Sequence, residues 1–323
     1  MNKIVKETAA YSEAEIAEIR ERAKRVSETE GRTVTDVAKE SGVPYQTFYA
    51  FINGTYNGNN ARVAGDVVIW LESREEKKQA AMAVPRDVPF VKTPSAEAIL
   101  NILMFAQVMP EIVVVAGGPG IGKTSSAEQY RSRNPNVWMV TMEPCSRSTY
   151  PMLSAIAEEM DVAEKVQTRL SRAIGRKVDG RGGLLIIEEA QHLDTMAIDQ
   201  LRALYDKYQV GIALLGNQSV YSKLEGESRK DGFAQLFSRI GHRITQNKPR
   251  AQDVCLLLAE WGVTDKKELQ FLKAIAAKPG GLRVLTKTMK LATMLAGGAD
   301  EPRGLEHIKA AWGNLSSSSD ASA

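Results

Sequence analysis

A lysine, a hydroxyl group and several glycines stand at spacings that suit the binding of a polyphosphate. The stretch EIVVVAGGPGIGKTSSAEQY, residues 111–130, matches the pattern G-x-x-x-x-G-K-[ST] without a mismatch. The glycines let successive backbone N–H groups turn inward, and the following helix adds the positive end of its dipole. The predicted nucleotide-binding residues are Gly117, Gly118, Pro119, Gly120, Ile121, Gly122, Lys123, Thr124 and Ser125.

Two members of this loop have distinct chemical roles. Lys123 would reach the β and γ phosphates of ATP, and the Thr124 hydroxyl would complete the coordination of Mg²⁺. The loop lies between a β-branched run and a run of helix formers, the context that the motif requires. The alternative, a glycine-rich turn that matches by chance, is disfavoured by the complete motif in this context. The sequence therefore predicts ATP and Mg²⁺ as cofactors.

An apolar run that ends in two acids supplies the second half of such a site. In GGLLIIEEAQHL, a predicted strand ends at Glu188 and Glu189, and ligands bind at the carboxyl edge of parallel sheets. Glu188 would order the metal, directly or through water, and Glu189 would polarise the attacking water. The structural alternative is a helix N-terminus enriched in acids. The neighbouring phosphate loop favours the catalytic interpretation.

The elements that must position these residues alternate between strands and helices. Apolar runs predict strands at 112–117, 137–142, 184–189 and 211–217, with helical patterns between them. This alternation predicts an α/β fold, a parallel sheet flanked by helices. Residues ahead of it, from a capping box at Ser12, and residues 250–312 behind it predict helices only.

The composition is that of an ordinary globular protein. The 323 residues are 43% hydrophobic and 25% charged, with a formal net charge of +3. This mildly basic balance permits a nucleic-acid partner but does not argue for one. Two distant cysteines and three histidines show neither a disulfide framework nor a metal-ligand spacing. With no signal peptide or membrane-crossing run in the sequence, we expect a cytoplasmic protein with no membrane partner.

Taken together, these motifs resemble those of the AAA+ ATPases. The first acid departs from the usual Asp, and the longer side chain of Glu188 moves its carboxylate outward. The resemblance implies that Asn217, at the end of GIALLGN, contacts the γ-phosphate or the water. It also implies an arginine finger in FAQLFSRIGHRI, with Arg239 the first candidate and Arg243 the second. In KPGGLRVLTKTM, Arg283 would reach the nucleotide from a helical lid. Because a neighbouring subunit supplies a finger, the protein would self-associate.

The amino-terminal segment resembles the repressor-type helix-turn-helix family. Ala38, Gly42 and Phe48 have the spacing that lets two helices approach, turn and pack together. The second helix would enter the major groove of DNA. Its candidate DNA-binding residues are Tyr45, Gln46, Thr47 and Tyr49. The alternative is a small helical bundle that contacts protein only, and the lack of Arg and Lys in this helix disfavours strong sequence specificity.

A basic series ahead of the acidic strand is the second candidate for DNA contact. Arg169, Arg172 and Arg176 recur at three and four residues, so they share one helical face. Lys177 extends the series, and Arg147 follows the second predicted strand on a loop. In a ring or a helix of subunits these side chains could line the interior. The alternative is a solvated charged face.

The order of domains and the overall length resemble the DNA transposition protein B family of Mu-like bacteriophages. We predict a helix-turn-helix domain at 1–72, a linker at 73–95, an AAA+ core at 96–247, a helical lid at 248–312 and a disordered tail at 313–323. The resemblance implies a slow, DNA-stimulated ATPase in the cytoplasm of a bacterial host. It would form filaments on double-stranded DNA with little sequence preference, deliver that DNA to a transposase and activate strand transfer.

Two other functions share parts of this pattern. A replication initiator or helicase loader would carry the same nucleotide motifs but would load a helicase. A nucleotide-switched transcriptional regulator would read an operator with its helix-turn-helix, and Glu188 in place of Asp keeps that alternative open. A sharp footprint on DNA would indicate the regulator, whereas length-dependent coating of any duplex would indicate the filament former.

Overall fold

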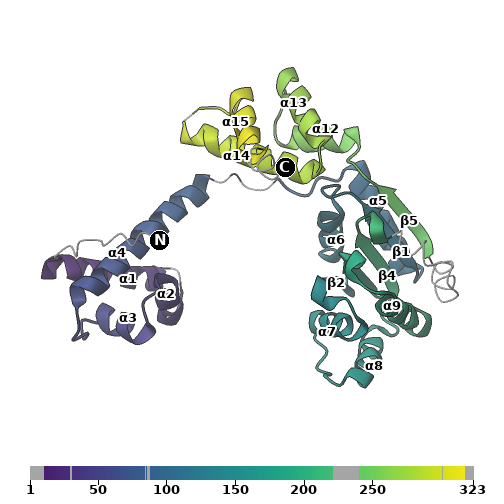
Figure 1. Cartoon of the computed structure of the whole chain (residues 1–323), viewed down its shortest axis with the longest axis horizontal. Helices are drawn as coiled ribbons and strands as arrows, with labels where there is room; N and C mark the ends of the chain where they lie inside the picture. Colours follow the sequence, from purple (N-terminus) through teal and green to yellow (C-terminus); the bar gives the residue numbers. More distant parts are fainter. Residues whose placement is uncertain are drawn as a thin grey trace. The chain divides into compact units, whose positions relative to one another are not determined.

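The computed structural model describes residues 11–29, 31–83, 85, 88–220, 240–299 and 301–316 (Figure 1). The chain divides into two compact units, Met1–Pro85 and Arg86–Ala323. Within the described ranges, no helix combines the length and the apolar composition that a bilayer-crossing segment needs.

The first unit is helical. Its elements are α1 (Glu13–Thr29), α2 (Val34–Ser41), α3 (Tyr45–Ile52) and α4 (Asn60–Ala83). The predicted capping box begins α1, because the Ser12 N–H donates to the Glu15 carboxylate at 2.7 Å and the Glu15 N–H donates to Ser12 Oγ at 3.3 Å. Gly42 ends α2 with a φ of 73°, a value that suits glycine. Ala38 and Phe48 are buried in one cluster, as their spacing predicts.

Five parallel strands form the sheet of the second unit, in the order β2-β3-β4-β1-β5. They are β1 (Ile112–Gly117), β2 (Val137–Thr141), β3 (Leu184–Glu188), β4 (Gly211–Gly216) and β5 (Ile240–Gln246). The parallel sheet and four of its strands confirm the prediction. β5 was not predicted, since IGHRITQ lies at the edge of the sheet, half of it exposed, and carries no apolar run.

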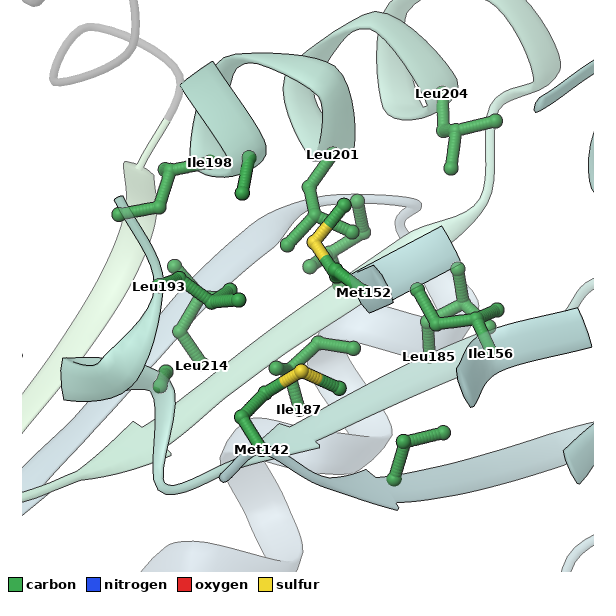
Figure 2. Packing of buried hydrophobic residues seen from close by; sticks show 14 of the residues in the cluster. Met142, Met152, Ile156, Leu185, Ile187, Leu193, Ile198, Leu201, Leu204 and Leu214 are labelled. Atoms are coloured by element: carbon green, nitrogen blue, oxygen red, sulfur yellow. The ribbon is translucent and has the colours of Figure 1, made fainter. Parts of the chain in front are cut away.

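Helices cover both faces of this sheet. One face is covered by α7 (Thr149–Glu159), α8 (Gln167–Val178) and α9 (Thr195–Tyr208), and the other by α5 (Pro94–Val108) and α6 (Lys123–Arg131). Alternate residues of β1 belong to the two cores that these helices form with the sheet. Figure 2 shows the first of these cores, in which the side chains of Met152 and Leu201 meet between the helices and the strand that carries Ile187. The β-branched and leucine runs of β1, β3 and β4 are buried on both faces of the sheet. This packing holds the carboxyl ends of these strands in place.

Four helices after β5 form a separate core. They are α12 (Ala251–Glu260), α13 (Lys266–Ala276), α14 (Gly281–Gly298) and α15 (Leu305–Ser316). The prediction of disorder from residue 313 was wrong for its first four residues, because α15 continues to Ser316. The rest of that segment, 317–323, lies outside the described residues.

The segment predicted as a linker, 73–95, is partly helical. Helix α4 continues through its first half to Ala83, since SREEKKQAAMA is rich in strong helix formers. At the other end, Thr93 caps α5 by accepting the N–H of Ala96 at 3.2 Å. Within this segment, the described residues that lack regular structure are those between the two helices, 85 and 88–93.

Candidate active site

The phosphate-binding motif forms a loop between β1 and α6. Gly120 and Gly122 have φ values of 77° and 95°, so both positions need the left-handed backbone that glycine tolerates. Helix α6 begins at Lys123, and no side chain caps its first turn. Its leading N–H groups and dipole therefore face the loop, as anion binding requires.

Two further glycines let the loop approach the segment that follows β5. A Cβ at Gly117 would overlap the carbonyl oxygen of Gln246, and one at Gly118 would overlap that of Asn247. The Gly118 N–H donates to the Gln246 carbonyl at 3.0 Å. The loop is thus held by main-chain contacts on the side away from its helix.

The side chain of Lys123 lies across the loop. Its Nζ donates to the carbonyl oxygens of Gly117 at 2.9 Å and Gly118 at 3.0 Å. Burial lowers the pKa of Lys123, the nearby Glu189 carboxylate opposes that change, and the Arg283 cation adds to it. The ammonium of Lys123 is therefore partly desolvated. Two other predicted residues of the nucleotide site, Glu189 and Arg283, lie close enough to act on its charge.

The two acids at the end of β3 have different surroundings. Glu188 is buried, with 7% of its surface exposed, and its Oε2 accepts the Thr141 hydroxyl at 3.2 Å. Glu189 has a φ of 51°, an uncommon value for a residue with a side chain. Of the two, only Glu189 lines the cavity described below. The turn after β3 thus separates a buried acid from one that faces the site.

Asn217 follows β4 at the same edge of the sheet. Its side-chain oxygen accepts the N–H of Ser219 at 2.8 Å and the Ser219 hydroxyl at 2.6 Å. Its main-chain N–H donates to Oε1 of Gln191 at 3.3 Å. The side-chain amide nitrogen is the group of Asn217 that suits contact with a phosphate oxygen.

A cavity of about 1000 Å³ lies between the loop and the helical region after β5. Lys123, Glu189, Asn217 and Arg283 all line it. It also takes in the predicted loop residues Gly117, Pro119, Gly120, Ile121, Gly122, Thr124 and Ser125. Gly118 instead lines a small neighbouring hollow together with Asn217 and Asn247. The structure therefore brings the sequence-predicted nucleotide residues to one place.

Some lining residues were missed by the sequence analysis. Val88, Phe90 and Val91 contribute apolar surface from the segment predicted as a linker, and Leu257 and Leu282 face the same cavity from α12 and α14. The only sequence signal at 88–91 is a short apolar run after a proline, VPFV, which does not reveal its contact partner. Such apolar walls suit a flat ring system.

Neither arginine-finger candidate is among the described residues that line the cavity. Arg239 falls outside the described residues. Arg243 is exposed on β5, where it stands opposite Val114 in the register of the sheet, and it is not among the residues that line the cavity.

The predicted DNA-binding residues of the first unit lie on α3. Tyr45 and Tyr49 are 47% and 50% exposed, and their ring centroids are 5.9 Å apart. Gln46 is exposed and Thr47 is half-buried. Phe48 turns inward to the core, so one face of α3 is polar and aromatic and the other is apolar.

The predicted basic series of the second unit lies on α8. Arg169, Arg172 and Arg176 are exposed and Lys177 is half-buried. Leu170, Ile174, Gly175 and Val178 are buried on the opposite face. Arg147 is exposed after a short helical turn, η1 (Pro144–Ser146), that follows β2. The helical face predicted from the spacing is therefore present, with arginines directed outward.

The donor set of the site fits Mg²⁺ better than a transition metal. The described residues contain no group of three or more His, Cys, Asp or Glu side chains placed to hold a metal. Thr124 lines the cavity with a hydroxyl oxygen, and the Glu188 carboxylate lies close enough to act on the charge of Lys123. Mg²⁺ is held in this way, by few protein oxygens together with phosphates and water.

The phosphate loop, the order of the sheet and the helical region that closes the cavity define an ATPase of the AAA class. Residues 109–224 match the family model of the AAA domain, so the protein is an ATPase that uses ATP. Among solved structures, the Walker-type ATPase of Pyrococcus abyssi superposes with a TM-score of 0.45 at 11% identity, over 71% of this chain and 75% of that one.

Residues 238–315 match the family model of the Mu B transposition protein, C terminal. The chain is 38% identical over 302 residues to the ATP-dependent target DNA activator B of Escherichia phage Mu, covering 93% of this chain and 96% of that protein. It is 32% identical over 260 residues to the Mu-like prophage FluMu DNA transposition protein B of Haemophilus influenzae, covering 79% and 90%. The chain belongs to the Mu B transposition protein family, which confirms the resemblance inferred from the sequence.

Proposed function

We propose that this ATPase binds ATP and Mg²⁺ in the cavity between the phosphate loop and the lid, and that the bound nucleotide joins neighbouring subunits on double-stranded DNA. The observation that carries the proposal is the composition of the cavity. Residues of the loop, of the carboxyl edge of the sheet and of α14 line it together. A ligand there bridges the core and the lid, so its presence changes how the two are held.

Four polar residues of the cavity have proposed roles in binding or hydrolysis. Lys123 moves from the loop carbonyls to the β and γ phosphates of ATP, where its charge is better satisfied. Glu189 accepts a proton from the attacking water, and the Asn217 amide orients the γ-phosphate or that water. Arg283 contacts the phosphates from the lid. Arg239, or failing it Arg243, stabilises the developing charge from a neighbouring subunit.

Magnesium would be held by Thr124 and, through water, by Glu188. Bound there, the metal would supply electrostatic stabilisation of the charge that develops on the phosphates. Glu188 is suited to the indirect role because it is buried beside Thr141 and does not line the cavity. The Thr141 hydroxyl keeps the Glu188 carboxylate oriented toward the end of β2.

DNA contacts come from the exposed arginines of α8 and from Arg147, with Lys177 at the margin. These side chains meet phosphates and therefore bind without much regard to sequence. An assembly repeats each weak contact along the duplex, and this multiplies affinity. On α3, which we interpret as the recognition helix of a helix-turn-helix, the exposed Tyr45, Gln46 and Tyr49 and the half-buried Thr47 add contacts in the groove.

The names of the relatives support the biological role. One is called an ATP-dependent target DNA activator and the other a DNA transposition protein. By extension, this protein marks target DNA in its ATP-bound state, delivers that DNA to a transposase and activates strand transfer. Hydrolysis, stimulated by DNA and slow because Glu188 replaces the usual Asp, releases the subunits.

The direct test is negative-stain electron microscopy with random-sequence duplex DNA, in ATP and in ADP. We expect continuous filaments in ATP that are lost in ADP, and no filaments for Lys123→Ala in either nucleotide. Isolated particles in both nucleotides would contradict the proposal. They would favour the helix-turn-helix regulator, for which the exposed polar face of α3 is the supporting observation, and operator footprinting would then follow.

A further inference from the structure

Gln191 connects two residues of the site from behind. It lies in a short 3-10 helix, η2 (Ala190–His192), directly after Glu189. Its amide nitrogen donates to the Glu189 carboxylate, and its amide oxygen accepts the main-chain N–H of Asn217 at 3.3 Å. One side chain thus joins the acid at the end of β3 to the first residue after β4.

The end of β4 is shaped to admit this side chain. A Cβ at Gly216 would overlap Oε1 of Gln191, so any larger residue there would displace the amide. Gly216 is the last residue of β4 and is buried. The close approach of Gln191 therefore depends on a residue without a side chain at one defined position.

Gln191 acts through other residues because it is not one of the described residues that line the cavity. Glu189 and Asn217 do line it. The Asn217 side-chain oxygen is engaged by Ser219, so the connection between β4 and the acid runs through the main chain of Asn217 and the amide of Gln191. The orientation of the Gln191 amide therefore depends on the position of the main chain at the end of β4.

We propose that Gln191 is a positioning residue that aims the Glu189 carboxylate at the water in line with the γ-phosphate. The inference rests on the proposed function, in which Glu189 accepts the proton. Glu189 has three rotatable side-chain bonds and an exposed carboxylate, so without a tether it samples orientations that do not reach the water.

The test is steady-state ATP hydrolysis by Gln191→Leu, which keeps the size of the side chain and removes both hydrogen bonds. We expect kcat to fall about 10- to 100-fold, because small displacements of a base have effects of that order. Since Gln191 does not line the cavity, KM and the affinity for a fluorescent ATP analogue should stay within about twofold of the wild type. Gln191→Glu, which keeps the acceptor and loses the donor, should also lower kcat.

A matched control is His192→Gln, which changes the neighbouring residue of the same turn and should leave kcat unchanged. If Gln191→Leu retains or exceeds the wild-type kcat, or loses kcat and nucleotide affinity together, the proposal is wrong. Should Gln191→Leu fail to fold, as judged by its melting curve, Gln191→Glu decides by the same criteria. Glu189→Gln separates the two ideas, since full turnover of that variant would refute the proposed role of Glu189 itself, whatever Gln191 does.

Discussion

The main-chain N–H of Leu282 donates a hydrogen bond of 2.9 Å to the carbonyl oxygen of Gly120. Leu282 lies in the first turn of α14 in the lid, and Gly120 lies in the phosphate-binding loop. Because both partners are main-chain groups, this contact does not depend on any side chain at either position. A shift of the loop around a bound phosphate must therefore move the lid or break the hydrogen bond. This relationship offers a direct route from nucleotide state to the surface of the lid.

Replacement of Gly120 by alanine should weaken this junction. The new Cβ would overlap the Gly280 carbonyl oxygen, and the φ of 77° adds a cost of about 1–2 kcal/mol for a residue with a side chain. Gly122→Ala is the matched control, since its φ of 95° is equally unfavourable but the nearest atom to the new Cβ is Ser126 Oγ at 3.9 Å. We expect chemical denaturation of the nucleotide-free protein to show the larger loss for Gly120→Ala. Equal losses would mean that lid and loop are not tightly packed.

The parts of this site that the sequence predicts are those with a local chemical pattern. Gly117 to Ser125 form one continuous motif whose geometry follows from its own backbone, so no tertiary information is needed to locate it. Glu188 and Glu189 are also located by a local pattern, because they directly follow the apolar run of a buried strand. The predicted strands β1, β3 and β4 are continuous apolar runs, because each is buried on both faces of the sheet.

The parts that sequence reasoning missed depend on contacts between distant segments. β5 is a polar edge strand that forms because it pairs with β1, and its own composition does not predict a strand. Gln191 is one amide among many until β3 and β4 lie side by side and bring it to Asn217. Likewise, Val88 to Val91 look like a linker because their partners in the cavity, such as Leu257 and Leu282, lie far along the chain.

The buried ammonium of Lys123 should make stability depend on pH in the alkaline range. Burial lowers the pKa of Lys123 from its ordinary value of 10.5, so the folded state releases this proton at lower pH than the unfolded state does. Below the folded pKa the charge therefore lowers the free energy of unfolding, and this penalty is relieved as pH rises toward 10.5. We expect the free energy of unfolding of the nucleotide-free wild type to rise relative to Lys123→Met as pH increases through this range.

Urea titrations of both proteins between pH 8 and about 10.5 would measure this difference, with Lys287→Met as the control because Lys287 is exposed at the rim of the same cavity. A wild-type advantage that shrinks with rising pH would show that the lysine gains more from the loop carbonyls than it loses by burial.

Glu189→Gln should trap the assembled state in ATP. The amide keeps the size and the hydrogen-bonding reach of the carboxylate but cannot accept the proton of the attacking water. We therefore expect ATP binding to be preserved, kcat to fall about 100-fold or more, and filaments on duplex DNA to persist after ATP is chased with ADP. Light scattering during the chase measures disassembly. Rapid disassembly of this variant would argue against Glu189 as the base.

A pair of substitutions tests which arginine acts across subunits in the proposed assembly. Arg239→Ala should abolish DNA-stimulated hydrolysis and leave ATP binding by isolated subunits intact, since a finger acts only on the nucleotide of a neighbour. Arg243→Ala, which removes the second candidate on the edge strand β5, should retain turnover if Arg239 is the finger. Mixing each variant with Lys123→Ala tests complementation between subunits. Full turnover of Arg239→Ala with loss in Arg243→Ala would reverse the assignment.

Asp253 holds the junction between core and lid, and its loss should have the largest effect on stability. It is fully buried, and its carboxylate accepts the Ser95 N–H at 2.9 Å, the Ser95 hydroxyl at 2.5 Å and the Arg250 N–H at 2.6 Å. These groups begin α5 and α12, and Ser95 also bonds the Gln246 side chain at the end of β5. One carboxylate thus fixes three segments that converge behind the phosphate loop.

Asp253→Ala would leave those three donors without their acceptor, and we expect the free energy of unfolding to fall by about 3 kcal/mol. Ser95→Ala is the control, because it removes one donor and keeps the carboxylate with its two main-chain partners, so it should cost about 1 kcal/mol. Chemical denaturation measures both. Asp253→Ala should also bind ATP more weakly than Ser95→Ala does, since α12 carries Leu257 into the cavity. If the two substitutions cost the same, the hydroxyl and not the carboxylate would organise the junction.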